Sequence, residues 1–227
     1  MNASVPAIAI RDLEFRWPAT RGCDGFSLKL PSLAVNPENS LFLHGPSGSG
    51  KSTLLNLVGG VLTPHSGCIE LLGQAFSALP AARRDAFRAD HIGFIFQQFN
   101  LIPYLSVLDN VVLPCRFSAR RAAQAADARA AATTLLAHLD IAPDLHARPA
   151  HALSVGQQQR VAAARALIGK PEILIADEPT SALDAPRQAA FVDLLLAEAR
   201  ANGSALIFVS HDLRLAAHFD AVLELSA

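Results

Sequence analysis

A glycine-rich segment from residue 45 to residue 53 constrains this chain more than any other feature; it reads Gly45-Pro46-Ser47-Gly48-Ser49-Gly50-Lys51-Ser52-Thr53. The apolar residues 40–44 before it are typical of a strand, and residues 54–58 after it are typical of the start of a helix. Strand, glycine loop and helix in this order are the context in which G-x-x-x-x-G-K-[ST] predicts a phosphate-binding loop. A Gly/Ser turn that matched by chance would not carry these flanking elements. The sequence therefore predicts a site for a nucleoside triphosphate.

The residue types in this segment suit that chemistry. Small residues let successive backbone N–H groups point inward and form an anion-binding nest. A helix that begins near Lys51 adds its unpaired amides and the positive end of its dipole. Lys51 can reach the β- and γ-phosphates, and the Ser52 hydroxyl can bind Mg²⁺. A nucleoside triphosphate with Mg²⁺ is therefore expected in this loop.

Composition bounds the class of protein. The 227 residues are 51% hydrophobic, with a mean hydropathy of +0.29, which suits one large domain or a core with an inserted subdomain and argues against disorder. The net charge of −1, from 19 basic and 20 acidic residues, gives no electrostatic case for nucleic-acid binding.

No apolar run reaches the length of a membrane span, and the N-terminus lacks a basic region, so we expect a soluble, cytoplasmic chain. The three cysteines, at 23, 68 and 115, lack metal spacing and are expected to be reduced and structural.

The N-terminal part has the pattern of antiparallel strands that lead into a parallel core strand. Residues 8–17 alternate apolar and polar, which places Phe15 and Trp17 on one face of a strand. Residues 26–30 alternate again, and 31–39 are interpreted as a turn-rich connection. Residues 68–73 are expected to form another strand.

The remaining two thirds alternate between helical and strand patterns. We expect helices over 79–90, 187–200 and 214–219, and a further helix that Ser154 caps and that runs through 161–168. We expect strands over 91–98, 171–178, 205–212 and 221–225. The alanine-rich stretch 101–152 is helical in pattern and is interpreted as an insertion into the α/β core.

Polar side chains follow three of the predicted strands. Asp177 and Glu178 end a continuous apolar run, the pattern of a central parallel strand whose carboxyl end lies at a ligand site. Asp177 is placed to hold Mg²⁺, through water, and Glu178 to act as general base for the attacking water. Taken alone, an acidic strand end, Gln97 or His211 could each be merely structural. The joint occurrence of these residues in this order favours a hydrolytic site.

Five segments together resemble an ATP-binding cassette (ABC) transporter ATPase over essentially the whole chain. They are GPSGSGKST at 45–53, GFIFQQFNLIPYLSVLDNV at 93–111, LSVGQQQRVAAARAL at 153–167, ILIADEPTSALD at 173–184 and IFVSHD at 207–212. The resemblance implies one α/β cassette domain over 1–227: a P-loop NTPase, RecA-like core with an antiparallel β-subdomain (about 1–90 and 165–227) and an inserted helical subdomain (about 98–160). It also implies a homodimer in which two cassettes enclose two ATP molecules head to tail.

The resemblance also assigns roles to individual residues. Gln97 would sense Mg²⁺ and the attacking water, Asp177 would serve the metal, and His211 would contact the γ-phosphate. From the opposite subunit, Ser154, Gly156 and Gln157 of the signature segment would contact ATP, and Asp184 would communicate across the dimer. Trp17 is the candidate for stacking on the adenine, with Phe15 on the same face as the rival and core packing as the alternative for both.

The chain departs from the family pattern in two places. Val155 stands where the signature LSGGQ has its first glycine, and a β-branched residue there is expected to restrict the backbone and weaken the closed dimer modestly. The turn at 36–40 lacks a common glycine, which we expect to be harmless.

The segment FQQFNLIPYLSVLDNVVLP is similar to cassettes of the lipoprotein-release, macrolide-efflux and FtsE-like group. This implies a separately encoded integral membrane permease of the FtsX or MacB kind, with the cassette peripheral on the inner face of the cytoplasmic membrane and a lean toward export or extraction. Phe99, Leu101, Ile102 and Tyr104 are either the docking groove for that partner or the core of the helical subdomain. A regulatory FtsE-like cassette and a soluble non-transport ABC ATPase stay as alternatives.

Overall fold

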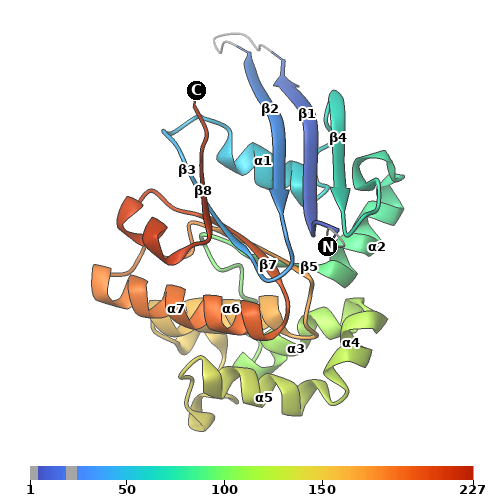
Figure 1. Ribbon diagram of the computed structural model, residues 1–227. Coiled ribbons are helices and arrows are strands. Elements are labelled where there is room, and N and C mark those ends of the chain that lie inside the picture. The colour runs from blue at the N-terminus through green and yellow to red at the C-terminus, as the bar shows by residue number, and fades with distance from the viewer. Residues whose placement is uncertain (1–4, 19–24, 227) are drawn as a thin grey trace.

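The computed structural model describes residues 5–18 and 25–226, which form two sheets and a set of helices (Figure 1). The antiparallel sheet has the order β2-β1-β4, with β1 at Ile8–Trp17, β2 at Phe26–Val35 and β4 at Ser66–Leu71. The second sheet has the order β5-β6-β7-β3-β8, and every neighbouring pair is parallel. Its strands are β3 at Ser40–His44, β5 at Ile92–Ile95, β6 at Ile173–Asp177, β7 at Ala205–Val209 and β8 at Ala221–Glu224.

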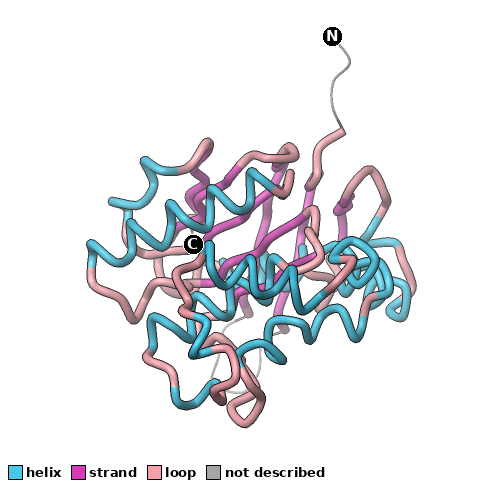
Figure 2. The backbone as a smooth tube through the Cα atoms, turned by 90° about the horizontal axis from the view of Figure 1, so that it is seen from below, coloured by secondary structure: helices cyan, strands magenta, loops and turns pink. Residues whose placement is uncertain are grey.

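The helices lie on both faces of the parallel sheet. They are α1 at Lys51–Val58, α2 at Ala81–His91, α3 at Val107–Phe117, α4 at Ala119–Ala125, α5 at Ala128–His138, α6 at Val155–Leu167 and α7 at Ala185–Ala201. Short 3₁₀ helices occur at Phe76–Ala78, Pro143–Leu145, Ala150–Ala152 and Leu213–His218. Seen from below, helices lie in front of the strands (Figure 2). We call α3–α5 and their connecting turns the helical layer. The predicted α/β fold with an antiparallel sheet is confirmed.

The continuous apolar runs of the parallel strands are explained by two separate cores, one on each face of the sheet. Along β6, Ile173 and Ile175 pack toward α1 and the antiparallel sheet, whereas Leu174 and Ala176 pack toward α6 and α7. Strands β3 and β7 alternate between the same two cores. Because side chains alternate across a strand, burial on both faces requires apolar residues at every position.

The predicted turn-rich connection over 31–39 is wrong in its first half, because β2 continues to Val35. Proline within a strand removes a backbone donor and is tolerated on an edge strand. Strand β2 is such an edge, and its pairing runs from Arg11 with Ser32 to Leu13 with Leu30, on either side of Pro31. Asp12, at the intervening position of β1, has a left-handed φ of 47°, which marks a local irregularity in the ladder.

The predicted strand over 91–98 is also too long. His91 ends α2, β5 covers only Ile92–Ile95, and Gln97 lies in the turn that follows. In the next segment the core interpretation is confirmed for Phe99 and Leu101, and the docking interpretation stays a prediction. Phe99 is buried in the core and Leu101 packs against it, while Tyr104 is 78% exposed.

Candidate nucleotide-binding site

The glycine loop between β3 and α1 has a conformation that needs glycine at two positions. Gly45 has φ 153°, and a Cβ there would lie 2.4 Å from the carbonyl oxygen of Leu225. Gly50 has φ 96°, and a Cβ there would lie 2.6 Å from Cζ of Phe26. Both positions therefore combine a left-handed backbone with neighbours that leave no room for a side chain.

The N-terminus of α1 opens into the pocket beside this loop. Gly50 caps the helix without any side-chain hydrogen bond, and its first turn carries no acidic residue. The first amides of the helix thus lack side-chain partners and can receive an anion. Lys51, 7% exposed, donates from Nζ to the carbonyl oxygens of Gly45 (2.8 Å) and Pro46 (2.9 Å), which holds its positive charge against the loop.

An aromatic wall borders the loop on the side of the antiparallel sheet. Trp17 is 46% exposed, donates from Nε1 to the Thr53 hydroxyl at 3.3 Å and lines a pocket of about 410 Å³ with the glycine loop. Phe15 is 5% exposed and meets the Trp17 ring edge-on, with 5.2 Å between ring centroids. The geometry therefore favours Trp17 over Phe15 as an open stacking surface. Phe26, which the sequence reasoning missed, lines the same pocket.

Two carboxylates and a histidine lie where β6 and β7 end. Glu178 and His211 line the pocket of the glycine loop, and Oε1 of Glu178 lies 2.5 Å from Nε2 of His211. Glu178 has a left-handed φ of 45°, and its amide donates to the carbonyl of Val209 at 3.1 Å. A strained backbone fixed by a neighbouring strand is a device that recurs at functional sites.

Asp177 fits a magnesium ion. Its pKa is raised, first by burial and then by the neighbouring Glu178 carboxylate, while Lys51 and a hydrogen bond from the Ser52 hydroxyl act in the opposite direction. A half-buried carboxylate of raised pKa beside a hydroxyl is a place where a hard cation would relieve repulsion. Within residues 5–18 and 25–226 no cluster of three or more His, Cys, Asp or Glu side chains is arranged to hold a metal. In nucleotide enzymes Mg²⁺ takes few protein ligands and completes its shell with phosphates and water, so Asp177 and Ser52 are suitable protein ligands for it.

Gln97 shares the carboxyl-terminal edge of the sheet with Asp177, because β5 pairs with β6 through Ile95 and Ala176. Its side chain is exposed and does not line the pocket of the glycine loop. The structure thus brings Gln97 to the correct edge without placing it among the pocket residues.

The signature residues lie in a different pocket of about 410 Å³, lined by Ser154, Val155, Gly156, Gln157, Leu183 and Phe191 among others. It shares no residue with the pocket of the glycine loop. Asp184 caps α7, accepting from the Arg187 amide at 3.1 Å, and Arg187 also lines the signature pocket. One chain therefore presents two separated halves of the predicted site.

Helix α6 begins at Val155, and Ser154 caps it as predicted. The Ser154 hydroxyl accepts from the Gln157 amide at 3.3 Å, and the Gln157 side chain accepts from the Ser154 amide at 2.9 Å. Val155 thus occupies an ordinary first helical position, and the expected backbone restriction has no visible local consequence. Its side chain is 48% exposed at the mouth of the pocket.

Comparison with known proteins identifies the class. Residues 28–181 match the ABC transporter family, and the chain belongs to this family of ATP-binding, ATP-hydrolysing cassettes.

Individual relatives agree with this assignment. The chain is 44% identical over 193 residues to the ABC transporter ATP-binding protein YbbA of Escherichia coli K12, covering 85% of this chain and 83% of that one. It is 39% identical to the lipoprotein-releasing system ATP-binding protein LolD of Hydrogenovibrio crunogenus, covering 95% and 89%. It is 40% identical to the macrolide export ATP-binding/permease protein MacB of Rhodopseudomonas palustris BisB18 over 96% of this chain, but over only 32% of that longer protein.

A solved structure shows the same fold. The dimeric ATP-binding cassette MJ0796, in a post-hydrolysis state with ADP and phosphate, superposes with a TM-score of 0.85 at 34% identity, covering 96% of this chain and 94% of that one. No helix among the described residues is long and apolar enough to cross a membrane.

Proposed function

We propose that two copies of this chain pair head to tail, so that the phosphate loop of one faces the signature segment of the other and two ATP molecules are enclosed. The observation that carries this proposal is the separation of the two pockets on one chain. Neither pocket contains all the residues of the predicted site, because the pocket of the glycine loop lacks the Ser154 end of α6 and the signature pocket lacks the glycine loop with Lys51. The dimeric state of the solved relative supports the same arrangement.

In this arrangement the loop from Gly45 to Thr53 holds the phosphates by its amides, and Lys51 neutralises their charge. Ser52, Gln97 and, through water, Asp177 would hold Mg²⁺, which supplies charge neutralisation at the phosphates when bound. Trp17 stacks on the adenine.

The contact between Glu178 and His211 explains how the attacking water is prepared. Glu178 accepts the proton of that water, and His211 holds the Glu178 carboxylate in place and reaches toward the γ-phosphate. Ser154, Gly156 and Gln157 of the opposite copy complete the donors around the γ-phosphate, and Asp184 lies beside them. The positioning of charge, rather than covalent chemistry, accounts for catalysis of this kind.

We further propose that a separate membrane protein of the FtsX or MacB kind docks on a groove of about 380 Å³ between the core and the helical layer. Phe94, Phe96, Pro114 and Phe117 line it. Phe117 is 76% exposed and Phe96 40% exposed, and exposed aromatic side chains that meet in one groove suit an apolar helix of a partner. The names of the LolD and MacB relatives, a lipoprotein-releasing system protein and a macrolide export protein, support export or extraction.

Replacement of Glu178 by Gln tests the hydrolytic site. The variant keeps the shape of the side chain but cannot take a proton from water, so Glu178→Gln should bind ATP, accumulate as an ATP-bound dimer and turn over at least 100-fold more slowly. Size-exclusion chromatography with light scattering, with and without ATP, and phosphate release measure these effects. Hydrolysis at the unchanged rate would remove Glu178 from the role of base.

Affinity purification from detergent-solubilised membranes tests the partner. A stoichiometric membrane protein with a large periplasmic domain would support export, extraction or FtsE-like signalling. A multi-span permease with a solute-binding protein would mean import instead. Recovery from the soluble fraction alone would contradict membrane docking while leaving the ATPase intact.

A further inference from the structure

Val155 stands where the signature pattern LSGGQ has a glycine, so it adds a side chain that the pattern lacks. It occupies the first position of α6, and the capping box of Ser154 and Gln157 already satisfies the start of this helix. The backbone at residue 155 is helical and requires no glycine. Valine loses rotamer freedom in a helix, so helix stability does not favour it either. Neither the backbone nor the helix therefore accounts for a valine at this position.

The side chain of Val155 is 48% exposed at the mouth of the signature pocket. Leu183 lines the same pocket, and a Cβ on Gly156 would lie 3.8 Å from Cδ2 of Leu183. Arg160 and Arg187 also line this pocket and bring positive charge to it. The first turn of α6 thus combines apolar side chains with surroundings that suit an anion.

Two backbone amides at the start of α6 are open to such an anion. The Gln157 amide donates to the Ser154 hydroxyl at 3.3 Å, and the Gln158 amide donates to the Ser154 carbonyl at 2.9 Å. The amides of Val155 and Gly156 have no hydrogen-bond partner within the described part of the chain. Unpaired amides at a helix N-terminus attract an anion, and this attraction strengthens where water is excluded. An apolar side chain beside these amides is therefore placed to keep water away from a bound phosphate.

The rim of the phosphate-loop pocket has room for an incoming side chain. Ser47 and Gly48 line that pocket and are exposed, and a Cβ on Gly48 would meet no described atom within 4 Å. In a head-to-tail pair the signature pocket of one copy faces this rim on the other copy. The exposed part of Val155 then leaves water as the two copies close. Removing apolar surface from water is favourable, and each dimer does so twice.

We propose that Val155 stabilises the closed dimer: its side chain packs between the copies at the edge of each ATP site and keeps water from the Val155 and Gly156 amides. This inference rests on the head-to-tail dimer proposed above. It reverses the expectation from sequence that a β-branched residue weakens the dimer, because α6 begins without any distortion that a glycine would relieve. The competing interpretation is that Val155 is one of the single exposed apolar side chains that protein surfaces commonly carry.

Val155→Thr separates these interpretations, because threonine keeps the branched shape and replaces one methyl group with a hydroxyl. The variant is made in the Glu178→Gln protein, which should bind ATP without hydrolysing it. Val222→Thr in the same background is the matched control, since Val222 is 52% exposed on β8 and lines neither pocket. The ATP affinity of the monomer is measured by equilibrium dialysis with labelled ATP below the dimer dissociation constant. The ATP-dependent dimer is measured by analytical ultracentrifugation.

We expect Val155→Thr to raise the dimer dissociation constant by about tenfold or more, because two valines per dimer lose their apolar contact. The ATP affinity of the monomer should stay within about twofold, since the signature pocket shares no residue with the pocket of the glycine loop. Val222→Thr should match the Glu178→Gln protein in both measurements. An unchanged dimer in Val155→Thr would overturn the inference, and so would an equal loss of ATP affinity and dimerisation.

Val155→Gly provides a second test, because it restores the LSGGQ pattern. A backbone restricted by valine predicts a tighter dimer for this variant, whereas a packed valine predicts a dimer about tenfold weaker or more. A dimer as tight as that of the Glu178→Gln protein, or tighter, would contradict the inference. If the Glu178→Gln protein itself forms no ATP-dependent dimer, the head-to-tail arrangement is contradicted together with this inference. An unchanged Val155→Thr dimer contradicts the role of Val155 alone.

Discussion

Trp17 is the only tryptophan of the chain, and it stands at the mouth of the phosphate-loop pocket with 46% of its surface exposed. If it stacks on the adenine, Trp17→Ala should weaken ATP binding by at least fivefold, since stacking of a base on an aromatic ring contributes on the order of 1–3 kcal/mol. Trp17→Phe keeps a ring and should recover part of the affinity.

Calorimetric titration with ATP measures both effects. Val222→Ala, at an exposed position of β8, is the control and should bind ATP normally. Equal affinities for all three variants would exclude Trp17 from the site and return the question to Phe15.

The raised pKa of Asp177 predicts that the stability of the protein depends on pH in a way that is unusual for a carboxylate. Its folded-state pKa is raised above the ordinary value of 3.8, so the native state binds this proton more tightly than the unfolded chain does. The contribution of Asp177 to stability is therefore favourable in acid and is lost as the pH rises through the raised pKa. At neutral pH without nucleotide, Asp177→Asn should unfold at a higher temperature than the native protein.

This gain should shrink as the pH falls toward 3.8, where both folded and unfolded chains become protonated. ATP with Mg²⁺ should reverse the order, because only the native carboxylate can bind the ion. Thermal unfolding followed by circular dichroism at several pH values provides the measurement. An Asp177→Asn protein that is less stable at neutral pH would contradict the assigned environment of Asp177.

Functional residues could be predicted from the sequence where their partners lie close to them in the chain. Gly45, Gly50 and Lys51 belong to one contiguous turn, so spacing alone indicated their arrangement. In the structure Gly50 and Lys51 line one pocket, and Lys51 donates to the Gly45 carbonyl. Phe26 and Arg165 have neighbours that are distant in sequence. Arg165 donates to the Phe99 carbonyl, 66 positions away, and no local pattern marks such a contact.

At the scale of elements, sequence reasoning succeeded where the element carries its own start signal. Ser154 followed three residues later by Gln157 is a capping box, and α6 begins there. The ends of β2 and β5 were misplaced because their limits depend on tertiary pairing. Pro31 is accommodated since β2 is an edge, and β5 is short since its chain turns away at the left-handed Phe99 and Asn100.

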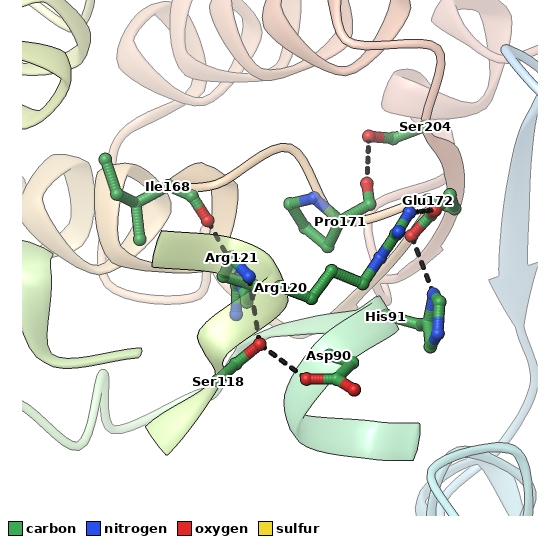
Figure 3. A network of polar contacts seen from close by, with 9 residues as sticks. All are labelled: Asp90, His91, Ser118, Arg120, Arg121, Ile168, Pro171, Glu172 and Ser204. Carbon is green, nitrogen blue, oxygen red and sulfur yellow. Dashed lines mark hydrogen bonds and ion pairs between the residues drawn. The ribbon is translucent and has the colours of Figure 1, made fainter. Parts of the chain in front are cut away.

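The junction of α4 with the core offers a prediction about stability. Figure 3 shows Arg121 beside Ile168, and Ser118 bonded to Asp90 at 2.5 Å; the Ser118 hydroxyl also caps the helix that carries Arg121. Burial lowers the pKa of Arg121 to about 10. Arg121 donates to the carbonyl oxygens of Ile168 at 2.9 Å and Ala166 at 2.5 Å. Arg121→Met should lower the free energy of unfolding by about 2–4 kcal/mol, because these two carbonyls lose their donor.

Urea unfolding measures this loss. Arg129→Met, which removes only an exposed ion pair, should cost less than about 1 kcal/mol. A similarly small loss of unfolding free energy in both variants would show that Arg121 is dispensable at the junction of α4 with the core.

At the scale of the molecule, the sequence predicted that the parallel sheet is covered on both faces, but it did not predict how the helical layer packs against the core. Continuous apolar runs indicated a sheet covered on both faces, and two cores confirm it. The seating of the helical layer depends on contacts such as that of Arg120 in α4 with Glu172, which lies 52 positions away. The same Glu172 also contacts His91 at the end of α2, 81 positions away. Contacts of this range leave no periodic trace in a sequence.

If each ATP site is completed by a second copy of the chain, two inactive variants with defects in different halves of the site should restore each other's activity when they are mixed. Lys51→Ala disables the phosphate loop and Ser154→Arg the signature end of α6, so each protein alone should hydrolyse ATP at a small fraction of the native rate. In a mixed dimer, the intact loop of the Ser154→Arg copy faces the intact signature of the Lys51→Ala copy. The mixture of the two variants should therefore hydrolyse ATP well above the rate of either variant alone. Activity that stays at the average of the two would contradict a site shared between copies.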